Sequence, residues 1–297
     1  MDRTVFLEQM DGLMVEQVVR DREYSMYSQH FHESYEMYFL LAGERYYFID
    51  RETYLVKAGM GVMVMRNQIH KTSMAGSSYH DRLLLQVDSG VFSPYMKVFG
   101  LPPIQDLFQR LDQVIEYTQQ EWETVLKLLE ALKQELKERR SGYEAAARML
   151  VMHILILTGR CQQVSQSSGH GRSDRPVQDI LIQDNHQAQT AKHQKIREVT
   201  EYLLIHYDSN ESQEELAKRF FVSKSYLCRI FKEVTGFTLN EYQNLARIKA
   251  ARQLLTNTDL SVTEIAGQVG FESITYFERV FKKLTGERPL QYRKNYR

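Results

Sequence analysis

Hydrophobic residues in the carboxy-terminal third of the chain recur at the spacing of amphipathic helices. Short helices are predicted at 224–234 and 273–284, with a longer helix at 239–255 between them. A further helix at 195–206 precedes this group. Each helix gathers its apolar residues on one stripe, which is typical of helices packed around a shared core. The pattern predicts an all-α domain over residues 195–297.

The short helix at 224–234 is repeated fifty positions later. The recurring residues are Ser223, Tyr226, Arg229, Phe231, Lys232, Thr235 and Gly236 in the first unit and Ser273, Tyr276, Arg279, Phe281, Lys282, Thr285 and Gly286 in the second. Upstream, Glu215-Leu216-Ala217 recurs as Glu264-Ile265-Ala266 with one residue fewer between the copies, so we place an additional residue of the second unit at Gly270. A repeat that accepts an insertion only in the turn between two helices describes a duplicated helix-turn-helix.

Serine residues mark the predicted helix starts in both units. Ser212 and Ser261 each precede a glutamate by three residues, which is the spacing of a capping box. Ser223 and Ser273 stand where the second helix of each unit needs an N-cap. The two units therefore begin their helices by the same local chemistry.

Two such units on one connecting helix predict a DNA-binding domain whose reading helices enter successive major grooves about 34 Å apart. Arg229 and Arg279 carry the planar fork that pairs with guanine, Thr275 suits the thymine methyl group, and Glu278 can accept from cytosine. Lysines and helix starts suit phosphates. An arginine on a helix surface is often only solvated, but its repetition on the same face favours contact with DNA. The candidate DNA-contacting residues are Ser223, Lys224, Ser225, Cys228, Arg229, Lys232, Ser273, Thr275, Glu278, Arg279, Lys282 and Lys283.

The amino-terminal half follows the shorter period of β-strands. The predicted strands are 35–41, 46–49, 53–56, 62–65 and 83–87, with breaks at Gly43, Asp50, Gly59, Gly61 and Gly76. Many short strands at close spacing predict a sandwich or a barrel.

A cluster of polar residues falls within these strands. On a strand His30 and His32 share one face, and Glu36 and His70 would complete a set of four metal ligands. The other interpretation is a polar pocket or hydrogen-bonded core histidines. We take His30, His32, Glu36, Tyr38 and His70 as candidate ligand-binding residues, and we expect neither a metal nor a cofactor.

Two amphipathic helices are predicted at 122–136 and 143–157. The apolar face of each helix could form a dimer interface or pack against the barrel of the same chain. Residues 161–194 are rich in Gln, Ser, Gly, His and Asp, which predicts a flexible linker that leaves the domain spacing adjustable. We therefore expect an effector-binding and dimerisation domain at 1–160 and a DNA-binding domain at 195–297.

Charge is segregated between the two halves, although the net charge of the chain is zero. From Lys192 onward there are 18 Lys and Arg against 13 Asp and Glu, a balance of +5, which leaves −5 for the preceding residues. A hydrophobic fraction of 43% and a charged fraction of 26% are ordinary for a globular protein. The segregation supports a nucleic-acid partner for the second half.

The sequence indicates neither secretion nor membrane insertion. The first ten residues show no secretory signal, and the strongly apolar run at 150–157 is too short to cross a bilayer. Cys161 and Cys228 cannot form a disulfide framework and lack the spacing of a zinc site, so we expect free thiols. These features favour a cytoplasmic location.

The run Gly270-Phe271-x4-Tyr276-Phe277-x-Arg279-x-Phe281-Lys282-x2-Thr285-Gly286-x2-Pro289-x2-Tyr292-Arg293 resembles the signature of AraC/XylS-type transcription regulators. The first unit, with Ala246, Arg247 and Ala251, is similar to the rest of that domain, so the resemblance covers residues 195–297. Residues 15–90 are similar to the cupin-like effector domain of many members. The spacing His30-x-His32-x3-Glu36-x6-Gly43 resembles the cupin metal motif.

The resemblance implies an α+β protein of two domains: an N-terminal cupin-like β-barrel followed by helices, and a C-terminal all-α domain with two helix-turn-helix units. It also implies a non-catalytic transcription regulator, an activator, controlled by a sugar or another small-molecule effector in the barrel. The implied partners are double-stranded DNA and a second copy of the chain in a homodimer, with RNA polymerase as a further candidate.

Two alternatives remain open from the sequence. One is a metal-dependent cupin enzyme fused to a DNA-binding tail, which would use His30, His32, Glu36 and His70 around a divalent ion. The other is a regulator whose barrel is purely structural.

Overall fold

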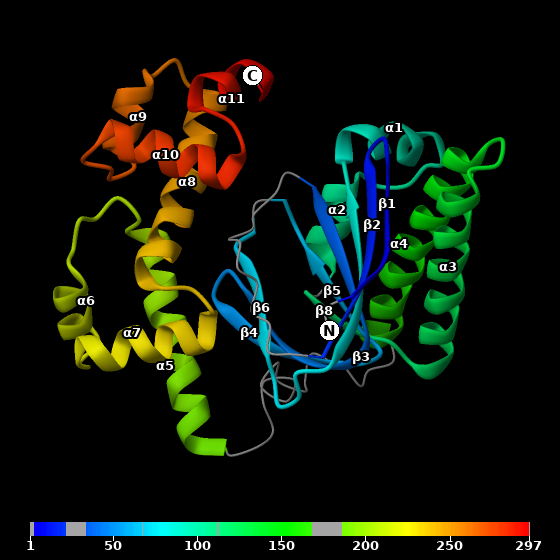
Figure 1. Cartoon of the computed structure of the whole chain (residues 1–297), viewed down its shortest axis with the longest axis horizontal. Coiled ribbons are helices and arrows are strands. Elements are labelled where there is room, and N and C mark those ends of the chain that lie inside the picture. The colour runs from blue at the N-terminus through cyan, green and yellow to red at the C-terminus, as the bar shows by residue number, and fades with distance from the viewer. Residues whose placement is uncertain (1–2, 22–33, 67, 112, 168–185, 297) are drawn as a thin grey trace.

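The computed structural model describes residues 3–21, 34–66, 68–111, 113–167 and 186–296. Two domains lie side by side (Figure 1): a β-barrel with helices on its outer side, and a domain made of helices. The barrel lies in the middle, between a pair of long helices and the helical domain. The predicted α+β architecture of two domains is confirmed.

The described residues form eight strands in the amino-terminal domain. They are β1 (Arg3–Met10), β2 (Leu13–Arg20), β3 (Tyr35–Ile49), β4 (Glu52–Lys57), β5 (Met60–Val64), β6 (His70–Met74), β7 (His80–Val87) and β8 (Val114–Glu116). Six of them are hydrogen-bonded in the order β1-β2-β7-β3-β5-β8, while β4 and β6 both pair with β3. The pairings are antiparallel. The central strand β3 therefore belongs to both sheets of the barrel.

The predicted strand break at Gly43 is wrong, because β3 is one continuous strand of 15 residues. Its first half pairs with β5 and β7, and its second half pairs with β4 and β6. Between the halves the register shifts at Leu40 to Ala42, and Gly43 has a φ of 86°. A Cβ at Gly43 would lie 2.3 Å from the carbonyl oxygen of Tyr79. Glycine bends the strand from one sheet into the other here, rather than ending it.

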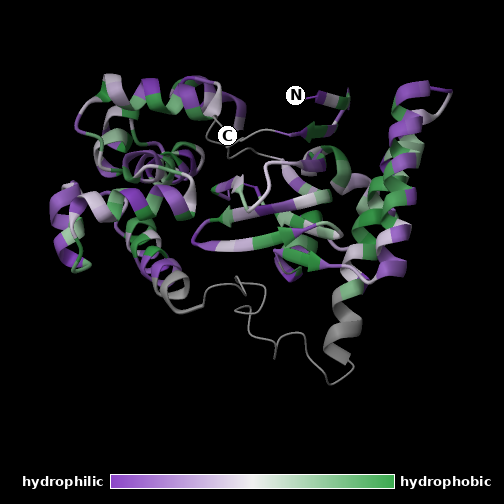
Figure 2. Ribbon diagram, turned by 60° about the horizontal axis from the view of Figure 1, so that its bottom comes forward, coloured by the Kyte–Doolittle hydropathy of each residue, from purple (hydrophilic) through white to green (hydrophobic). Residues whose placement is uncertain are grey.

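Alternate residues of β3 face two different cores. Met37 and Phe39 are fully buried in an outer core beneath helices α3 (Gln119–Glu138) and α4 (Tyr143–Ser167), whereas Tyr38 faces the barrel interior. Figure 2 shows the hydrophobic residues of α3 and α4 turned toward the sheet. The apolar stripe predicted for α3 is thus buried within one chain, so these helices cover the barrel.

Two shorter helices follow β7, and neither helix was predicted from the sequence. They are α1 (Ser89–Val98) and α2 (Ile104–Arg110). The side chain of Asp88 caps α1 by accepting a hydrogen bond from the Gly90 N–H at 2.7 Å. Within the described residues, no helix combines the length and the hydrophobicity needed to span a membrane.

The helical domain contains the predicted helices, although the first of them begins earlier than expected. They are α5 (His186–Ile205), α6 (Gln213–Arg219), α7 (Lys224–Thr235), α8 (Leu239–Asn257), α9 (Val262–Gln268), α10 (Ile274–Thr285) and α11 (Pro289–Tyr296). Ser212 and Ser261 form the predicted capping boxes, and Ser223 and Ser273 cap α7 and α10. The local start signals read from the sequence are confirmed.

Helices extend into both ends of the predicted linker. α4 continues to Ser167, and α5 begins at His186 although its start was predicted at Lys195. The polar stretch after His186 contains several Ala and Gln residues, which favour helix formation. Residues 168–185 lie outside the described residues, so the linker at 161–194 stays a prediction as a domain boundary.

The additional residue of the second helix-turn-helix unit is Glu272, and its placement at Gly270 was wrong. Phe221 and Gly270 occupy equivalent positions after the first helix, with φ values of 57° and 90°. The next residue of each unit, Val222 or Phe271, donates a backbone hydrogen bond to the carbonyl five residues before it. The units therefore match up to Phe271, and the extra residue follows it.

The barrel packs directly against the helical domain. Phe48 and Ile69 are buried in the core of the helical domain, although they belong to the amino-terminal half. The Phe48 ring meets Phe237 and Tyr242 edge-on, with ring centroids 6.1 and 6.0 Å apart. This contact was not expected from the adjustable spacing predicted for the linker.

Replacing Phe221 by glycine is expected to stabilise the protein. Its side chain is 93% exposed, so its removal loses little burial, while glycine relieves the left-handed backbone. After the entropic cost of glycine, we expect a gain of roughly 0.5–1 kcal/mol in the free energy of unfolding by urea titration.

The matched control is Gly270→Ala, whose Cβ would lie 2.5 Å from the Asp208 carbonyl oxygen. We expect this change to destabilise the protein by roughly 1–3 kcal/mol. A destabilising Phe221→Gly would contradict the strain argument.

Candidate DNA interface and barrel interior

The structure exposes the helix faces that were predicted to contact DNA. On α7 the residues Leu227, Ile230 and Phe231 are buried, and the candidate residues lie on the opposite side. Eleven of the twelve candidates on the two units are exposed. The twelfth, Cys228, is half-buried against the core, with its Sγ 3.5 Å from Oε1 of Gln213. Its thiol is therefore the least accessible atom of the set.

Each reading helix stacks an arginine on a tyrosine three residues earlier. The guanidinium carbon of Arg229 lies 5.5 Å from the ring centroid of Tyr226, and that of Arg279 lies 5.2 Å from Tyr276. Such stacking restrains the arginine and presents its fork outward. Tyr226 itself is 40% exposed. The repeated Tyr-x-x-Arg spacing was the signal that could have placed it on the surface.

The connecting helix α8 also supports the second arginine. Asn244 of α8 donates a hydrogen bond from Nδ2 to the Tyr276 hydroxyl at 3.0 Å. This bond fixes the ring on which Arg279 rests. The orientation of Arg279 therefore depends on α8 as well as on α10.

α8 sets the separation of the two units. Its 19 residues span about 28 Å, which is close to the pitch of B-form DNA. Buried side chains surround the helix, because both units pack against it. These residues are Leu239, Tyr242, Leu245, Ala246, Arg247, Ile248, Ala251, Arg252 and Leu255.

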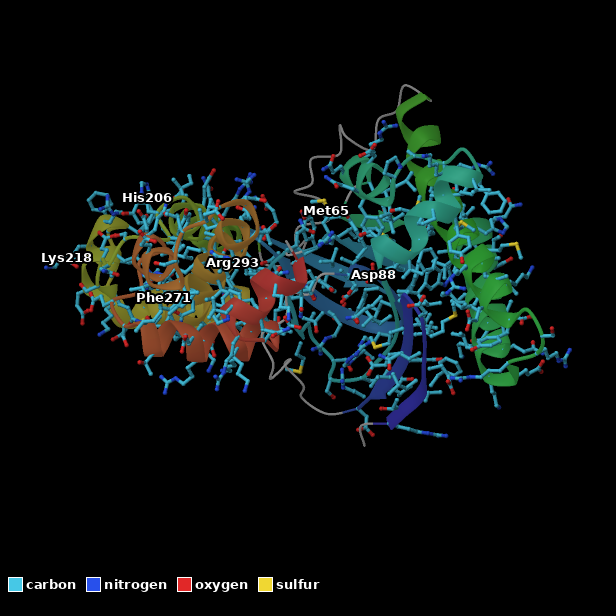
Figure 3. All side chains as sticks on the ribbon, turned by 90° about the horizontal axis from the view of Figure 1, so that it is seen from above. Met65, Asp88, His206, Lys218, Phe271 and Arg293 are labelled. Carbon is cyan, nitrogen blue, oxygen red and sulfur yellow. The ribbon has the colours of Figure 1, made fainter. Side chains whose placement is uncertain are left out.

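Three arginines of the helical domain donate hydrogen bonds to groups within that domain instead of pointing into solvent. Arg247 donates to the carbonyl oxygens of Tyr207 and Ser209 at 2.7 and 2.8 Å. Arg252 donates to the hydroxyl of a buried tyrosine, and Arg293 donates to two backbone carbonyls. Figure 3 shows Arg293 on the helical domain seen from above. The excess of basic residues in this domain is therefore partly structural, which the sequence did not reveal.

Inside the barrel, Glu36 lies between two partners. It accepts a hydrogen bond from the Tyr47 hydroxyl at 2.9 Å, and its other oxygen lies 3.6 Å from Nε2 of His70, an ion-pair distance. The Tyr38 ring meets Tyr47 edge-on at 5.1 Å. The structure thus brings together three predicted ligand-binding residues, Glu36, Tyr38 and His70. The other two, His30 and His32, lie outside the described residues.

The pair of Glu36 and His70 favours the charged imidazole. Burial lowers the pKa of His70, but the negative charge of Glu36 and the bond to the Gln68 carbonyl outweigh it, so the pKa is raised. Burial and the same carboxylate raise the pKa of Tyr47 well above its ordinary value. Glu36 is therefore the anionic centre of this part of the interior.

Metal ligation would need more donors than the described residues bring together. Among them, no group of three or more His, Cys, Asp or Glu side chains is arranged to hold a metal ion. Cys161 is buried and Cys228 half-buried, and both are free thiols. The four-ligand set that includes His30 and His32 stays a prediction from the sequence.

One strand joins the barrel interior to the first reading helix. His70 faces inward on β6, and the next residue, Lys71, faces the helical domain. Its Nζ donates to the carbonyl oxygen of Gly236, which caps α7, and lies 4.8 Å from the Phe237 ring centroid. The Tyr242 hydroxyl also donates to the Asp50 carbonyl oxygen. A shift of β6 would therefore reach the end of α7.

Ion pairs flank this contact between the domains. Arg51 lies 3.1 Å from Glu201 of α5, and Arg197 of α5 lies 3.1 Å from Glu52. In each pair the arginine is about half exposed, so both pairs contribute little stability by themselves. Their reciprocal arrangement fixes which part of α5 meets the barrel.

Two family models match this chain. A helix-turn-helix domain matches residues 216–295, and an AraC-like ligand binding domain matches residues 17–155. The first covers both units and α8, and the second covers most of the barrel with α3 and half of α4. The chain thus carries a DNA-binding domain and a ligand-binding domain of known types.

Individual relatives resemble the helical domain. The HTH-type transcriptional regulator YijO of Escherichia coli K12 is 36% identical over 98 residues, which are 33% of this chain and 35% of the relative. YisR of Bacillus subtilis 168, also an HTH-type transcriptional regulator, is 32% identical over 114 residues, 38% of this chain and 40% of the relative. The alignments therefore span well under half of either relative.

A solved structure of ToxT from Vibrio cholerae O395 aligns with 97% of this chain and 99% of its own, at 13% identity and a TM-score of 0.38. The matched families and relatives are transcription regulators and not enzymes, which contradicts the alternative of a metal-dependent cupin enzyme. A helix-turn-helix match in one half and an AraC-like match in the other show that this chain belongs to the AraC/XylS-type family of transcription regulators.

Proposed function

We propose that the protein binds specific DNA sequences through α7 and α10 and regulates transcription in the cytoplasm under the control of a small molecule. The observation that carries the proposal is the pair of exposed arginines, Arg229 and Arg279, each stacked on a tyrosine at equivalent positions. Two restrained guanidinium groups, one on each helix-turn-helix unit, suit two major-groove contacts.

The candidate residues divide into two roles. Arg229, Arg279, Thr275 and Glu278 are exposed side chains suited to base edges. The exposed lysines and the capping serines surround them and suit phosphates. Base contacts set sequence preference, whereas phosphate contacts set overall affinity and its salt dependence.

Control by a small molecule is supported by the path from the barrel to α7. Glu36, Tyr38 and His70 face the interior, while Lys71 on the same strand binds the carbonyl of Gly236. A ligand that binds one arrangement of β6 better than another would bias the docking of the first reading helix. The family resemblance suggests a sugar or another small metabolite.

Assembly into a homodimer follows from the same proposal, since two copies would present four reading helices. Exposed apolar residues support such an interface: Val98 at the end of α1, Phe99 directly after it, and Met149 on α4. RNA polymerase is a further partner that we propose for the DNA-bound form.

Arg279→Ala and Lys282→Ala are expected to differ in kind. Arg279→Ala removes the guanidinium group and should reduce the preference for one base pair by about 1–3 kcal/mol. Loss of the lysine should weaken all sequences alike and reduce the salt slope by about one. Selection from random DNA followed by salt titration measures both. Lys127→Ala, an exposed lysine of α3, is the control, and equal losses on every sequence from both changes would refute this division.

Tyr276→Ala and Tyr276→Phe separate the ring from its hydroxyl. The alanine variant loses the platform under Arg279, and we expect it to reproduce part of the lost base preference, about 0.5–1 kcal/mol. The phenylalanine variant keeps the ring and loses only the bond from Asn244, so its preference should stay near that of the natural protein. Equal effects of the two variants on base preference would show that stacking does not position Arg279.

The stability of the barrel is expected to fall as His70 loses its proton. A pKa raised by folding gives stability that is complete below the unfolded pKa and is lost as pH rises through the folded pKa. Melting temperatures should therefore fall as pH rises above the ordinary pKa of histidine. Glu36→Gln should flatten this dependence, and Glu123→Gln on the surface of α3 should not. An unchanged slope in Glu36→Gln would contradict the assigned pair.

A further inference from the structure

The carboxy-terminal ends of the two reading helices have the same local structure. Gly236 and Gly286 end α7 and α10 in the left-handed conformation, with φ values of 76° and 82°. In each turn the threonine before the glycine accepts a hydrogen bond from the N–H of the residue after it, at 3.0 and 3.3 Å. The two helix ends are therefore matched copies, and a difference in their surroundings has its origin elsewhere in the chain.

The amino-terminal domain covers the end of α7 and leaves the end of α10 open. A Cβ at Gly236 would lie 2.8 Å from Cδ of Lys71, whereas a Cβ at Gly286 would meet no described atom within 4 Å. The residue after the glycine is Phe237 in the first unit, where it is fully buried, and Glu287 in the second, where it is half-buried. The unit that meets the barrel thus carries the aromatic residue at this position, and the other unit carries a charge.

The barrel donates hydrogen bonds to the last turn of α7. The final carbonyl groups of a helix have no partner within the helix. Lys71 of β6 donates from Nζ to the Gly236 carbonyl oxygen, and Thr53 of β4 donates from Oγ1 to the Val234 carbonyl oxygen at 3.4 Å. Lys71 also places a positive charge at the negative end of the helix dipole. Two strands of the amino-terminal domain therefore complete the cap of the first reading helix.

The reading face of α7 stays open while the barrel is docked on the helix end. Ser225, Arg229 and Lys232 are all exposed in the whole chain. Lys232 is exposed although it lies in the last turn of α7, beside the capped end. A contact that inhibits DNA binding by occlusion would be expected to cover some of these side chains. The docking contact is therefore compatible with DNA on this face.

We propose that the docked arrangement is the DNA-binding form of the protein, and that Lys71 is a positioning residue that holds the last turn of α7 for the phosphate contact of Lys232. An effector that releases β6 would weaken the contact of the first unit with DNA, and one that fixes β6 would strengthen it. The role in DNA binding rests on the proposed function, whereas the cap on α7 rests on the structure alone.

The test compares the full chain with its Lys71→Met variant, which keeps the length of the side chain but removes the charge and the hydrogen bond. Affinity for a selected DNA site should fall by about two- to fivefold. Lys71→Arg keeps a cation and its donors, so it should bind more tightly than Lys71→Met. The matched control is Lys57→Met, which changes an exposed lysine at the other end of β4 from Thr53 and should leave the affinity unchanged.

Hydroxyl-radical footprinting at saturating protein shows which unit is affected. Lys71→Met should weaken protection in the segment contacted by α7 and leave the segment contacted by α10 unchanged. Arg229→Ala and Arg279→Ala identify the two segments. Higher affinity of Lys71→Met overturns the proposal, because the contact would then be inhibitory. Unchanged affinity, or equal loss of protection in both segments, overturns it too.

Hydrogen exchange of the full chain without DNA tests the cap by itself. In Lys71→Met, backbone amides at 232–238 should exchange about two- to fivefold faster, and those at the equivalent positions 282–288 should not change. Unchanged exchange at 232–238 would show that Lys71 does not hold the end of α7. If the natural protein selects no DNA sequence, the regulator proposal fails, and the exchange rates still decide whether Lys71 caps α7.

Discussion

The structure depends on the burial of α8 between the two helix-turn-helix units. Because its apolar residues and two arginines contact both units, neither unit can rotate without breaking the core of the domain. A buried helix of about 28 Å is a rigid spacer, and its length is close to one turn of DNA. Two side chains of α8 also position residues of the second unit. Asn244 donates a hydrogen bond to the Tyr276 hydroxyl, and Arg247 stacks on the Phe271 ring.

The same helix is where the effector domain docks. Phe48 packs against Tyr242 at the amino-terminal end of α8, and Lys71 binds the cap of α7. These contacts involve the first unit, while α9 and α10 lie farther along α8 (Figure 1). An effector that moves β6 would therefore act first on the unit that contains α7. This asymmetry offers a route by which a ligand changes DNA affinity without unfolding either unit.

The sequence predicted most of the helical domain because its signals are local. Capping serines, apolar stripes and glycines with positive φ each determine structure within a few residues, and Gly236 and Gly286 end α7 and α10 as their positions suggest. The barrel was less predictable. β6 has the polar sequence His-Lys-Thr-Ser-Met and forms because it pairs with β3, and Gly43 bends that strand through contacts with Tyr79. The burial of Arg45 was not predicted from the sequence. Long-range pairing decides these features, and no short pattern records it.

The central claim is that two reading helices enter successive major grooves on one face of DNA. Hydroxyl-radical footprinting of the full chain on a selected site tests it most directly, together with insertion of half a helical turn between the two contacted segments. The account predicts two protected segments about one turn apart on one face of the duplex, and a large loss of affinity when about five base pairs separate them further. A single protected segment, or unchanged affinity after the insertion, would contradict it.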